Sequence, residues 1–119
     1  LARWVLLLDD PHVQVLVTED DEGLTSLVAY DPGSLRHLAV RPDLWGKGLA
    51  SAGVRRAVEA IAATGSEVAV LWCLELNHRA RRLYEHLGWR ATDGQGPEER
   101  RQTPWPPYPT EMRYRRKLP

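Results

Sequence analysis

The segment from residue 34 to residue 65 places the strongest constraint on the fold, because strand, turn and helix signals follow one another within it. Residues 34–40 have strand composition, and Pro42 ends the strand because proline cannot donate to a β-ladder. Gly46 and Gly48 then favour a turn. After the turn, apolar residues recur with the spacing of one helix face, at Leu49, Val54, Ala57, Val58 and Ile61. The segment therefore predicts a strand followed by a crossover helix.

The other segments continue this alternation of strands and helices. Two strand-like runs around an acidic turn predict a β-hairpin. A later apolar run has strand length and predicts a central strand that is covered on both faces. A second helix is expected to begin after Asn77 and to end at Gly88. The predicted strands are 13–18, 24–30, 34–40, 68–76, 89–92 and 110–117.

The length and composition indicate one folded domain. A chain of 119 residues is long enough for one hydrophobic core and too short for two. Its 43% hydrophobic and 27% charged residues are ordinary for a globular protein. Residues 1–119 are therefore predicted to form a single domain of the α/β (α+β) class, with a mixed sheet and helices on both faces. The first residue is Leu1 rather than Met, and the run 2–8 that follows has helical amphipathicity, so we expect a first strand and helix upstream.

Charge and cysteine content exclude several classes of function. The formal net charge is zero, which argues against the broad basic surface of a nucleic-acid-binding protein. The apolar run 4–8 is too short to span a membrane. Cys73 is the single cysteine, so an internal disulfide is impossible, no metal site is expected, and the cytoplasm is the expected location. Residues 78–119 hold ten basic and five acidic side chains, and could meet an anionic ligand or simply be solvated.

The turn after residue 40 has the features of an anion site. It presents unpaired backbone N–H groups at a helix N-terminus, where the helix dipole adds roughly half a positive charge. Gly46 and Gly48 would let the backbone approach phosphate oxygens, because they carry no Cβ atom. The spacing differs from that of the Walker loop, and the third glycine of the dinucleotide-binding fingerprint is missing. An ordinary tight turn is the alternative.

Two motifs resemble those of the GCN5-related N-acetyltransferase (GNAT) family. The pyrophosphate motif of that family begins with Gln or Arg, and has glycine at its fourth position and glycine or alanine at its sixth. The segment Trp45-Gly-Lys-Gly-Leu-Ala50 matches at the fourth and sixth positions and departs at Trp45. The later family motif, Asn-x-x-Ala-x-x-Leu-Tyr-x-x-x-Gly-Phe, matches at Asn77, Ala80, Leu83, Tyr84 and Gly88, with Trp89 in place of the final Phe.

The resemblance implies a fold and a coenzyme site. The strands that end at Val40 and Leu76 would splay apart, with the pantetheine arm of acetyl-coenzyme A between them. Backbone groups of Leu38 and Val40 would pair with the pantetheine and the thioester carbonyl, and amides of the glycine turn would hold the pyrophosphate. Asn77 would bond the coenzyme, although capping its own helix explains that residue equally well. The coenzyme-binding residues are thus Leu38, Ala39, Val40, Trp45, Gly46, Lys47, Gly48, Leu49, Ala50, Ser51, Asn77 and Tyr84.

The resemblance also implies a mechanism of direct attack by an amine on the thioester. The backbone N–H of Leu38 would stabilise the tetrahedral oxyanion. Tyr84 would protonate the departing thiolate, since a phenol with a pKa of about 10 is protonated at neutral pH. The alternative for Tyr84 is a core tyrosine. Cys73 lies in an apolar strand, so we expect it to pack inertly and not to act as a nucleophile.

The residue that removes the amine proton is left unassigned. Many members of the resembled family carry a glutamate on the strand before the glycine turn, and here that strand offers Ser34 and Arg36 on the corresponding face. The remaining candidates are His37, Glu75, Glu111 and ordered water.

The connection 94–109 contains the run Pro-Trp-Pro-Pro-Tyr-Pro and is expected to be extended and stiff. Trp105 and Tyr108 would then contact the amine substrate, because this loop borders the acceptor pocket in the resembled fold. An exposed loop over the sheet edge, or a dimer contact, is the alternative. The last strand, 110–117, is expected to be exposed, where it could pair with a second copy in a homodimer.

The predicted function is an N-acetyltransferase that moves the acetyl group of acetyl-CoA to a primary amine of a small molecule or peptide. Acetyl-CoA would be a co-substrate, and no metal, nucleic acid or membrane partner is expected. The alternative is an acyl-CoA-binding sensor domain without turnover, which the missing glutamate and Trp45 favour. A purely structural interaction module is a third interpretation.

Overall fold

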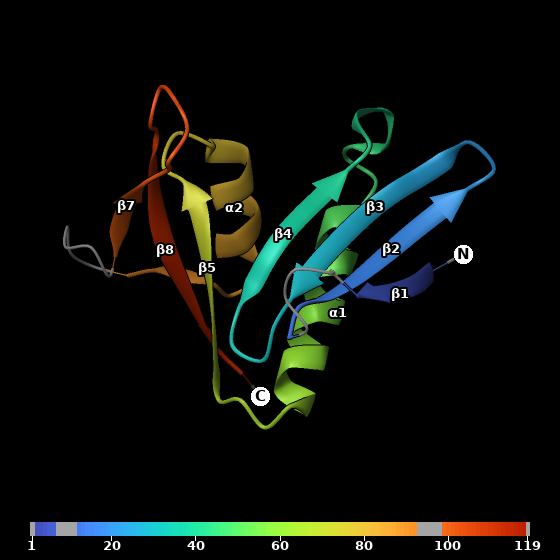
Figure 1. Cartoon of the computed structure of the whole chain (residues 1–119), viewed down its shortest axis with the longest axis horizontal. Coiled ribbons are helices and arrows are strands. Elements are labelled where there is room, and N and C mark those ends of the chain that lie inside the picture. The colour runs from blue at the N-terminus through green and yellow to red at the C-terminus, as the bar shows by residue number, and fades with distance from the viewer. Residues whose placement is uncertain (1, 7–11, 93–98, 119) are drawn as a thin grey trace. The chain divides into compact units, whose positions relative to one another are not determined.

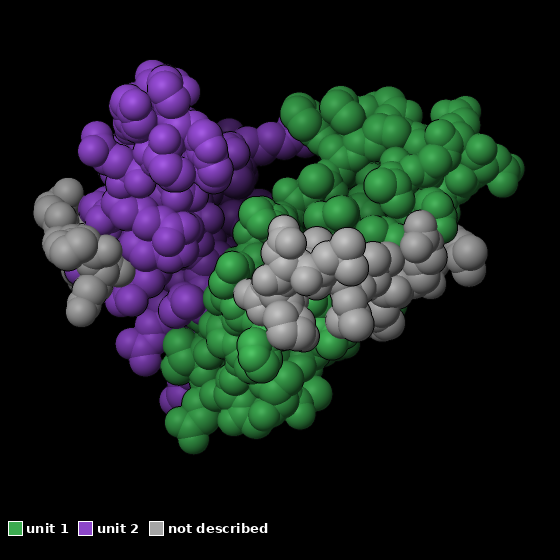
Figure 2. Space-filling view, in the orientation of Figure 1, with its two compact units in different colours: residues 1–69, 118–119 green, residues 70–117 purple. Residues whose placement is uncertain are grey.

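The computed structural model describes residues 2–6, 12–92 and 99–118. The chain divides into two compact units, coloured separately in Figure 2. Unit 1 comprises Leu1–Ala69 with Leu118–Pro119, and unit 2 comprises Val70–Lys117. Each unit is described in its own right.

Unit 1 is built on an antiparallel sheet whose four described strands follow one another in chain order (Figure 1). The strands are β1 (Ala2–Leu6), β2 (Gln14–Asp20), β3 (Gly23–Tyr30) and β4 (Leu35–Val40). Gly23 adopts a φ of 120° after the β2–β3 turn, a conformation that favours glycine. At the β3–β4 turn, Asp31 accepts hydrogen bonds through Oδ1 from the backbone N–H groups of Gly33 and Ser34. The predicted hairpin and third strand are therefore confirmed.

Helix α1 (Leu49–Ala63) covers one face of this sheet and packs against β3 and β4. Its buried face consists of Val54, Ala57, Val58 and Ile61, as the apolar spacing predicted. The helix closely approaches the sheet at Gly53, where a Cβ atom would lie 3.4 Å from Leu38 Cδ1 and 3.9 Å from Val28 Cβ. On the other face of the sheet, a second cluster buries Val13, Val15, Val17 and Ala29. The position of α1 is therefore set by apolar packing immediately beyond the glycine turn.

The predicted helix at residues 2–8 is wrong over its described part. Residues 2–6 form β1, which pairs with β2 from Ala2 opposite Thr18 to Leu6 opposite Gln14. A short apolar run fits both a helix and a buried strand, and periodicity alone does not separate them. Residues 2–6 form a strand because their backbone groups pair with those of β2. Residues 7 and 8 lie outside the described part of the chain.

Unit 2 combines one helix with four strands in its described residues, and the first of these strands, β5, begins at the end of unit 1. In chain order these are β5 (Val68–Leu74), α2 (His78–His86), β6 (Arg90–Ala91), β7 (Arg100–Gln102) and β8 (Thr110–Lys117). The strand order is β5–β8–β6, and β7 also pairs with β8. Both β6 and β7 are antiparallel to β8. The α+β class, with antiparallel sheets and helices, is confirmed, whereas the single-domain prediction is not tested.

The burial of β5 differs from the prediction of a central strand covered on both faces. Its side chains alternate, with Ala69, Leu71 and Cys73 buried and the residues between them partly exposed. Within the described sheet of unit 2, β5 stands at one end of the strand order. The outer face is partly covered by a long side chain, since the guanidinium of Arg101 lies 4.1 Å from the centre of the Trp72 ring. The apolar composition of β5 therefore predicted more burial than the structure shows, because only one of its two faces is fully buried.

The last strand is also not the exposed edge that was predicted. Strand β8 lies between β5 and β6 in the sheet order, and β7 pairs with it as well. Its Met112 and Tyr114 are buried. Because its backbone groups are used within unit 2, the argument for dimer pairing through this strand is lost.

The proline-rich connection before β8 folds into a turn instead of an extended segment. The backbone N–H of Tyr108 donates to the carbonyl of Trp105 at 2.7 Å, and the N–H of Thr103 donates to Pro109 O at 2.9 Å. Strand β7, which the sequence did not predict, precedes the turn and makes the connection a hairpin. Residues 94–98 of the predicted segment lie outside the described residues. A search of the described helices finds none that is long and apolar enough to cross a membrane.

Candidate functional site

The outer edge of β4 carries backbone groups that point away from β3. Hydrogen-bonded and non-hydrogen-bonded pairs alternate along an antiparallel ladder. The N–H of Arg41 donates to Thr25 O at 2.9 Å, and the register continues with Val40 opposite Ser26 and Leu38 opposite Val28. The alternation therefore turns the N–H and C=O groups of Leu38 and Val40 toward the outer edge, as a strand-like ligand would require.

A bulge interrupts β4 near its start. Ala29 pairs with His37, while Tyr30 pairs with Leu35, so Arg36 is the extra residue. Arg36 and His37 are both exposed, and Arg36 Nη1 lies 3.0 Å from Asp31 Oδ2. The bulge leaves the stretch from His37 to Val40 in regular register. Within β4 no carboxylate is available as a base, as the sequence already indicated.

A short 3-10 helix, η1 (Pro42–Leu44), leads from β4 to the glycine turn. The backbone N–H of Leu44 donates to Arg41 O at 2.9 Å, and that of Trp45 donates to Pro42 O at 3.3 Å. The indole Nε1 of Trp45 donates to Val40 O at 2.8 Å, which confirms that this carbonyl points away from β3. The Trp45 side chain is nevertheless 52% exposed.

The two glycines of the turn are required by backbone conformation. Gly46 and Gly48 both have a φ of 82°, in the left-handed region that other residues rarely adopt. A Cβ atom built on either glycine would meet nothing within 4 Å. Both glycines therefore leave open space above the turn.

The N-terminus of α1 opens from this turn. Gly48 is the N-cap, and its carbonyl accepts the first helical hydrogen bond, from Ala52 N–H at 3.0 Å. Because the first N–H groups of any helix lack acceptors within it, those of Leu49, Ala50 and Ser51 face the space before the helix. No acidic residue lies in the first turn of α1. Together with the exposed Lys47, the arrangement favours an anion.

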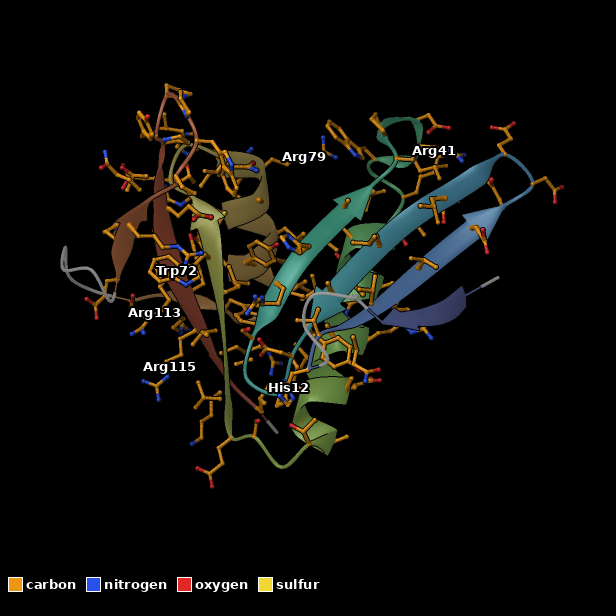
Figure 3. The ribbon with its side chains drawn as sticks, viewed as in Figure 1. His12, Arg41, Trp72, Arg79, Arg113 and Arg115 are labelled. Atoms are coloured by element: carbon orange, nitrogen blue, oxygen red, sulfur yellow. The ribbon has the colours of Figure 1, made fainter. Side chains whose placement is uncertain are left out.

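Arg41 ties the start of the connection to the β2–β3 hairpin (Figure 3). Its guanidinium lies 2.7 Å from Asp43 Oδ1, 3.1 Å from Asp20 Oδ2 and 3.8 Å from Glu22 Oε2. Hydrogen bonds from Arg41 are the main reason why the pKa values of Asp20 and Asp43 lie below their usual range. No local pattern indicates the pair between Arg41 and Asp20, because these two residues are far apart in the chain.

In unit 2, Asn77 caps the N-terminus of α2, which was one of the two roles considered for it. Its Oδ1 accepts a hydrogen bond from the backbone N–H of Ala80 at 3.1 Å, at the start of α2. The cap is therefore confirmed, while contact with a coenzyme stays a prediction. Gly88 follows the helix with a φ of 92°, as expected after its C-terminus.

Tyr84 is the buried residue of α2. Its ring lies 6.2 Å, centre to centre, from those of Trp89 and Tyr114. Burial, with a smaller contribution from Cys73, raises the pKa of Tyr84 to about 12. Tyr84 therefore combines the features of a core residue with those of a phenol that stays protonated at neutral pH. Burial likewise raises the pKa of Cys73 to about 11, which supports its inert role.

A hydrogen-bonded network beside Tyr84 was missed by sequence reasoning. Arg81 donates through Nε to Tyr114 Oη and through Nη1 to Glu75 O, both at 3.0 Å. The hydroxyl of Tyr114 in turn donates to Glu85 Oε2 at 2.5 Å. The network joins α2 to β8 and to the end of β5. Its one sequence signal is weak: Arg81 precedes Tyr84 by three residues and so shares its helix face.

The tip of the β7–β8 hairpin exposes two aromatic side chains. Trp105 is 71% exposed and Tyr108 is 52% exposed. The backbone N–H of Glu75 donates to Thr110 O at 2.9 Å, so the end of β5 lies beside the start of β8. Leu76, just beyond β5, is 80% exposed. This end of unit 2 thus presents apolar surface on two neighbouring segments.

Two of the candidate bases are engaged in ion pairs. Glu75 Oε2 lies 3.5 Å from Arg100 Nε, and Glu111 Oε1 lies 3.0 Å from Arg101 Nε. His37 belongs to unit 1 and is exposed on β4. Among the described residues, no group of three or more His, Cys, Asp or Glu side chains is placed to hold a metal ion.

The predicted site residues fall into two groups. The β4 edge, the glycine turn and the start of α1 lie together in unit 1, whereas Asn77, Tyr84, Trp105 and Tyr108 belong to unit 2. The joining of these two groups into one pocket, and the splaying of the strands that end at Val40 and Leu76, stay predictions.

Comparison with known families decides the wider classification. The sequence model of the Acetyltransferase (GNAT) family matches residues 3–89, which is more than half of the chain. The chain belongs to this family. The match spans the β4 edge, the glycine turn and Tyr84. A comparison with curated proteins finds no significant match.

Solved structures support the same fold. The chain resembles nourseothricin acetyltransferase with a TM-score of 0.77 at 18% identity, over 95% of this chain and 69% of that one. It resembles the ribosomal-protein-S18-alanine N-acetyltransferase from Escherichia coli with a TM-score of 0.74 at 16% identity, over 92% of this chain and 71% of that one. It also resembles a chain of the NatC complex bound to Gag peptide and CoA, with a TM-score of 0.70 at 16% identity, over 92% of this chain and 72% of that one. At these identities the likeness shows the fold, and GNAT membership implies acyl transfer from acetyl-CoA.

Proposed function

We propose that this GNAT protein transfers the acetyl group of acetyl-CoA to a primary amine of a small molecule or peptide, by direct attack in a ternary complex. The observation that carries the proposal is the glycine turn, whose open space and unpaired helix amides suit a pyrophosphate next to a strand edge with outward-facing groups. The structural likeness to an alanine N-acetyltransferase supports an amine acceptor.

The coenzyme is held mainly by backbone groups of unit 1. The pyrophosphate accepts hydrogen bonds from amides of residues 46–51, where the dipole of α1 favours negative charge. Lys47 adds a positive charge beside the turn. The pantetheine arm lies along β4 and pairs with Leu38 and Val40, as an added strand would. A ligand held in this way is recognised by chain geometry, and few side chains are needed for it.

The acetyl transfer breaks the C–S bond and forms a C–N bond. The neutral amine attacks the thioester carbon, and the negative charge develops on the carbonyl oxygen, where Leu38 N–H donates a hydrogen bond. Collapse of this intermediate expels the coenzyme thiolate. Tyr84 protonates the sulfur, and the proton lost by the nitrogen returns the tyrosinate to its neutral form through solvent. No covalent enzyme intermediate is required.

The raised pKa of Tyr84 has two consequences for this role. At about 12 the phenol is fully protonated at neutral pH, so the donor is always present. A thiol has a pKa of about 8.5, so proton transfer from Tyr84 to a free thiolate is uphill by a pKa difference of roughly 3.5. The transfer is therefore expected to accompany bond breaking, with reprotonation of the tyrosinate completing the cycle. We assign no side chain as the base for the amine.

The acceptor amine is proposed to contact the hairpin tip of unit 2. Trp105 and Tyr108 are exposed and held by a turn with two backbone hydrogen bonds. Aromatic faces attract cationic and apolar groups, which suits an amine substrate before it loses its proton.

A second function, acyl-CoA binding without turnover, is favoured by two observations. Trp45 stands where the family motif begins with Gln or Arg, and β4 carries no carboxylate. This alternative predicts tight coenzyme binding and no thiol release with any amine.

One experiment separates the two functions. Acetyl-CoA is titrated calorimetrically into the purified chain and into Gly48→Glu, which places a carboxylate in the open space above the turn. Gly23→Glu is the matched control, because Gly23 also has a positive φ and faces open space in unit 1. Binding that is lost in Gly48→Glu alone locates the coenzyme, and an amine screen for thiol release then tests turnover. Equal binding by all three proteins would contradict the assigned coenzyme site.

A further inference from the structure

The side chain of Trp45 has a defined partner at the start of the glycine turn. Its indole Nε1 donates to Val40 O at 2.8 Å, although the residue is 52% exposed. Burial therefore does not explain why a tryptophan lies in this position. The bond instead joins the last residue of β4 to the residue immediately before Gly46.

This bond closes the connection between the strand and the turn. The backbone bonds inside the connection are the Leu44–Arg41 pair at 2.9 Å and the longer Trp45–Pro42 pair at 3.3 Å. Neither of them reaches back to β4. The indole bond does, and it fixes the residue from which the two left-handed glycines depart. Glycine is the residue with the most conformational freedom to lose, so an anchor directly before Gly46 limits the conformations of the turn.

The indole hydrogen bond also engages one of the backbone groups that the outer edge of β4 offers to a ligand. The carbonyl of Val40 faces the outer edge of β4, where it accepts the indole N–H. Because a carbonyl oxygen has two lone pairs, a ligand that pairs with β4 at this end shares Val40 O with the indole and has Val40 N–H and the backbone groups of Leu38 as further partners.

We propose that Trp45 is a positioning residue for the coenzyme: its indole N–H anchors the glycine turn to β4 and preorganises the turn amides for the pyrophosphate. The coenzyme part of this inference rests on the proposed function, whereas the anchoring of the turn does not. A preorganised site binds more tightly because less conformational entropy is lost on binding. The net contribution of one hydrogen bond corresponds to an affinity change of roughly 3- to 10-fold.

A matched pair of variants isolates the hydrogen bond from the bulk of the ring. In Trp45→Gln the side-chain nitrogen is separated from Cα by the same number of bonds as the indole nitrogen, so the donor is kept. Trp45→Met has the same chain length and lacks a donor. Comparing these two variants cancels the loss of the indole ring, which both share.

Two measurements are made on the parent and on both variants. The first is the backbone order parameter of Gly46, Lys47 and Gly48 by NMR relaxation without any ligand, which reports motion of exposed amides that lack a hydrogen bond. The second is calorimetric titration of CoA. We expect Trp45→Met to have lower order parameters at these amides and to bind CoA roughly 3- to 10-fold more weakly than Trp45→Gln, which stays close to the parent.

The outcomes distinguish this inference from the proposed function. Equal order parameters and equal affinity in the Gln and Met variants would overturn the role of the indole N–H. Lower order parameters in Trp45→Met, in a protein that binds no CoA even as the parent, would support the anchoring and overturn the proposed coenzyme site. Equal order parameters with different CoA affinity would also overturn the anchoring, because the donor would then act on the ligand directly.

Discussion

The glycine turn of unit 1 and the Tyr84 region of unit 2 differ in the groups that they offer: the turn offers backbone amides, and the Tyr84 region offers a side chain. The turn uses backbone amides, left-handed glycines and open space, and its side chains serve to hold the backbone in place. The Tyr84 region uses a buried side chain whose surroundings raise its pKa. A backbone site is sensitive to conformation, whereas a side-chain site is sensitive to the removal of single atoms. Substitutions in the two regions should therefore affect different measured quantities.

The largest effect is expected from Tyr84→Phe, which removes one hydroxyl and leaves the ring. If Tyr84 is the general acid, kcat should fall roughly 10²- to 10⁴-fold while the Kd for acetyl-CoA changes little. The measurement is thiol release at saturating acetyl-CoA, beside a thermal melt.

Tyr114→Phe provides the control for Tyr84→Phe. It removes a hydroxyl that bonds Arg81 and Glu85, so we expect it to lower stability by about 1–3 kcal/mol and to change kcat less. A Tyr84→Phe protein that turns over like the parent would make Tyr84 a core residue and remove the contrast between the two regions.

Gly48→Ala tests the backbone region. A left-handed conformation costs a residue with a Cβ atom roughly 1–2 kcal/mol, so the turn should deform and acetyl-CoA affinity should fall about 5- to 30-fold. Gly33→Ala is the control, since a Cβ atom there also meets nothing within 4 Å. Unchanged affinity in Gly48→Ala would show that the left-handed conformation is not needed for binding.

The raised pKa of Tyr84 also predicts a dependence of stability on pH. The folded pKa of about 12 lies above the unfolded value of about 10, so the neutral phenol is favoured by folding. This contribution to the free energy of unfolding is complete below about pH 10 and is lost as the pH rises toward 12, by at most roughly 3 kcal/mol.

Urea unfolding of the parent and of Tyr84→Phe between about pH 9 and pH 11 measures that contribution. Burial also raises the pKa of Cys73, to about 11, but this residue is present in both proteins and largely cancels. Identical pH dependence in the two proteins would mean that Tyr84 is more solvated than the structure shows.

The smallest effect is expected from Asn77→Ala, which removes the cap of α2. The loss of the bond to Ala80 N–H should lower stability by about 1 kcal/mol, and Asn77→Ser should retain most of it. Calorimetry then decides between the two roles of Asn77. Weaker acetyl-CoA binding by Asn77→Ser, with the cap preserved, would sharpen the coenzyme role, and unchanged binding would leave Asn77 as a cap.

Local signals predicted most of the elements and the glycine turn. The hairpin, β4, α1, α2 and β8 were all expected from periodicity, proline and glycine positions, and capping residues. These signals act over a few residues, so they can be detected in the sequence itself. The outward-facing groups of Leu38 and Val40 were expected only through the family resemblance, and the β3–β4 register now provides the physical reason.

The errors arose where distant segments interact. The pairing of residues 2–6 with β2 turned a predicted helix into a strand, and the pairing of β7 with β8 turned an extended proline-rich loop into a hairpin. The Arg81–Tyr114–Glu85 network and the Arg41 cluster were invisible for the same reason. No local pattern specifies a partner that lies many residues away in the chain.

The sequence by itself determined the order of most elements, the glycine turn at Gly46 and Gly48, and the family resemblance. These properties depend on backbone preference and on motif spacing, which are properties of neighbouring residues. Only the tertiary structure decided which strand edges are paired, that Val40 O is held by the Trp45 indole, and that burial raises the pKa of Tyr84. Hydrogen-bond partners and burial depend on which distant atoms come together, and that is settled by packing.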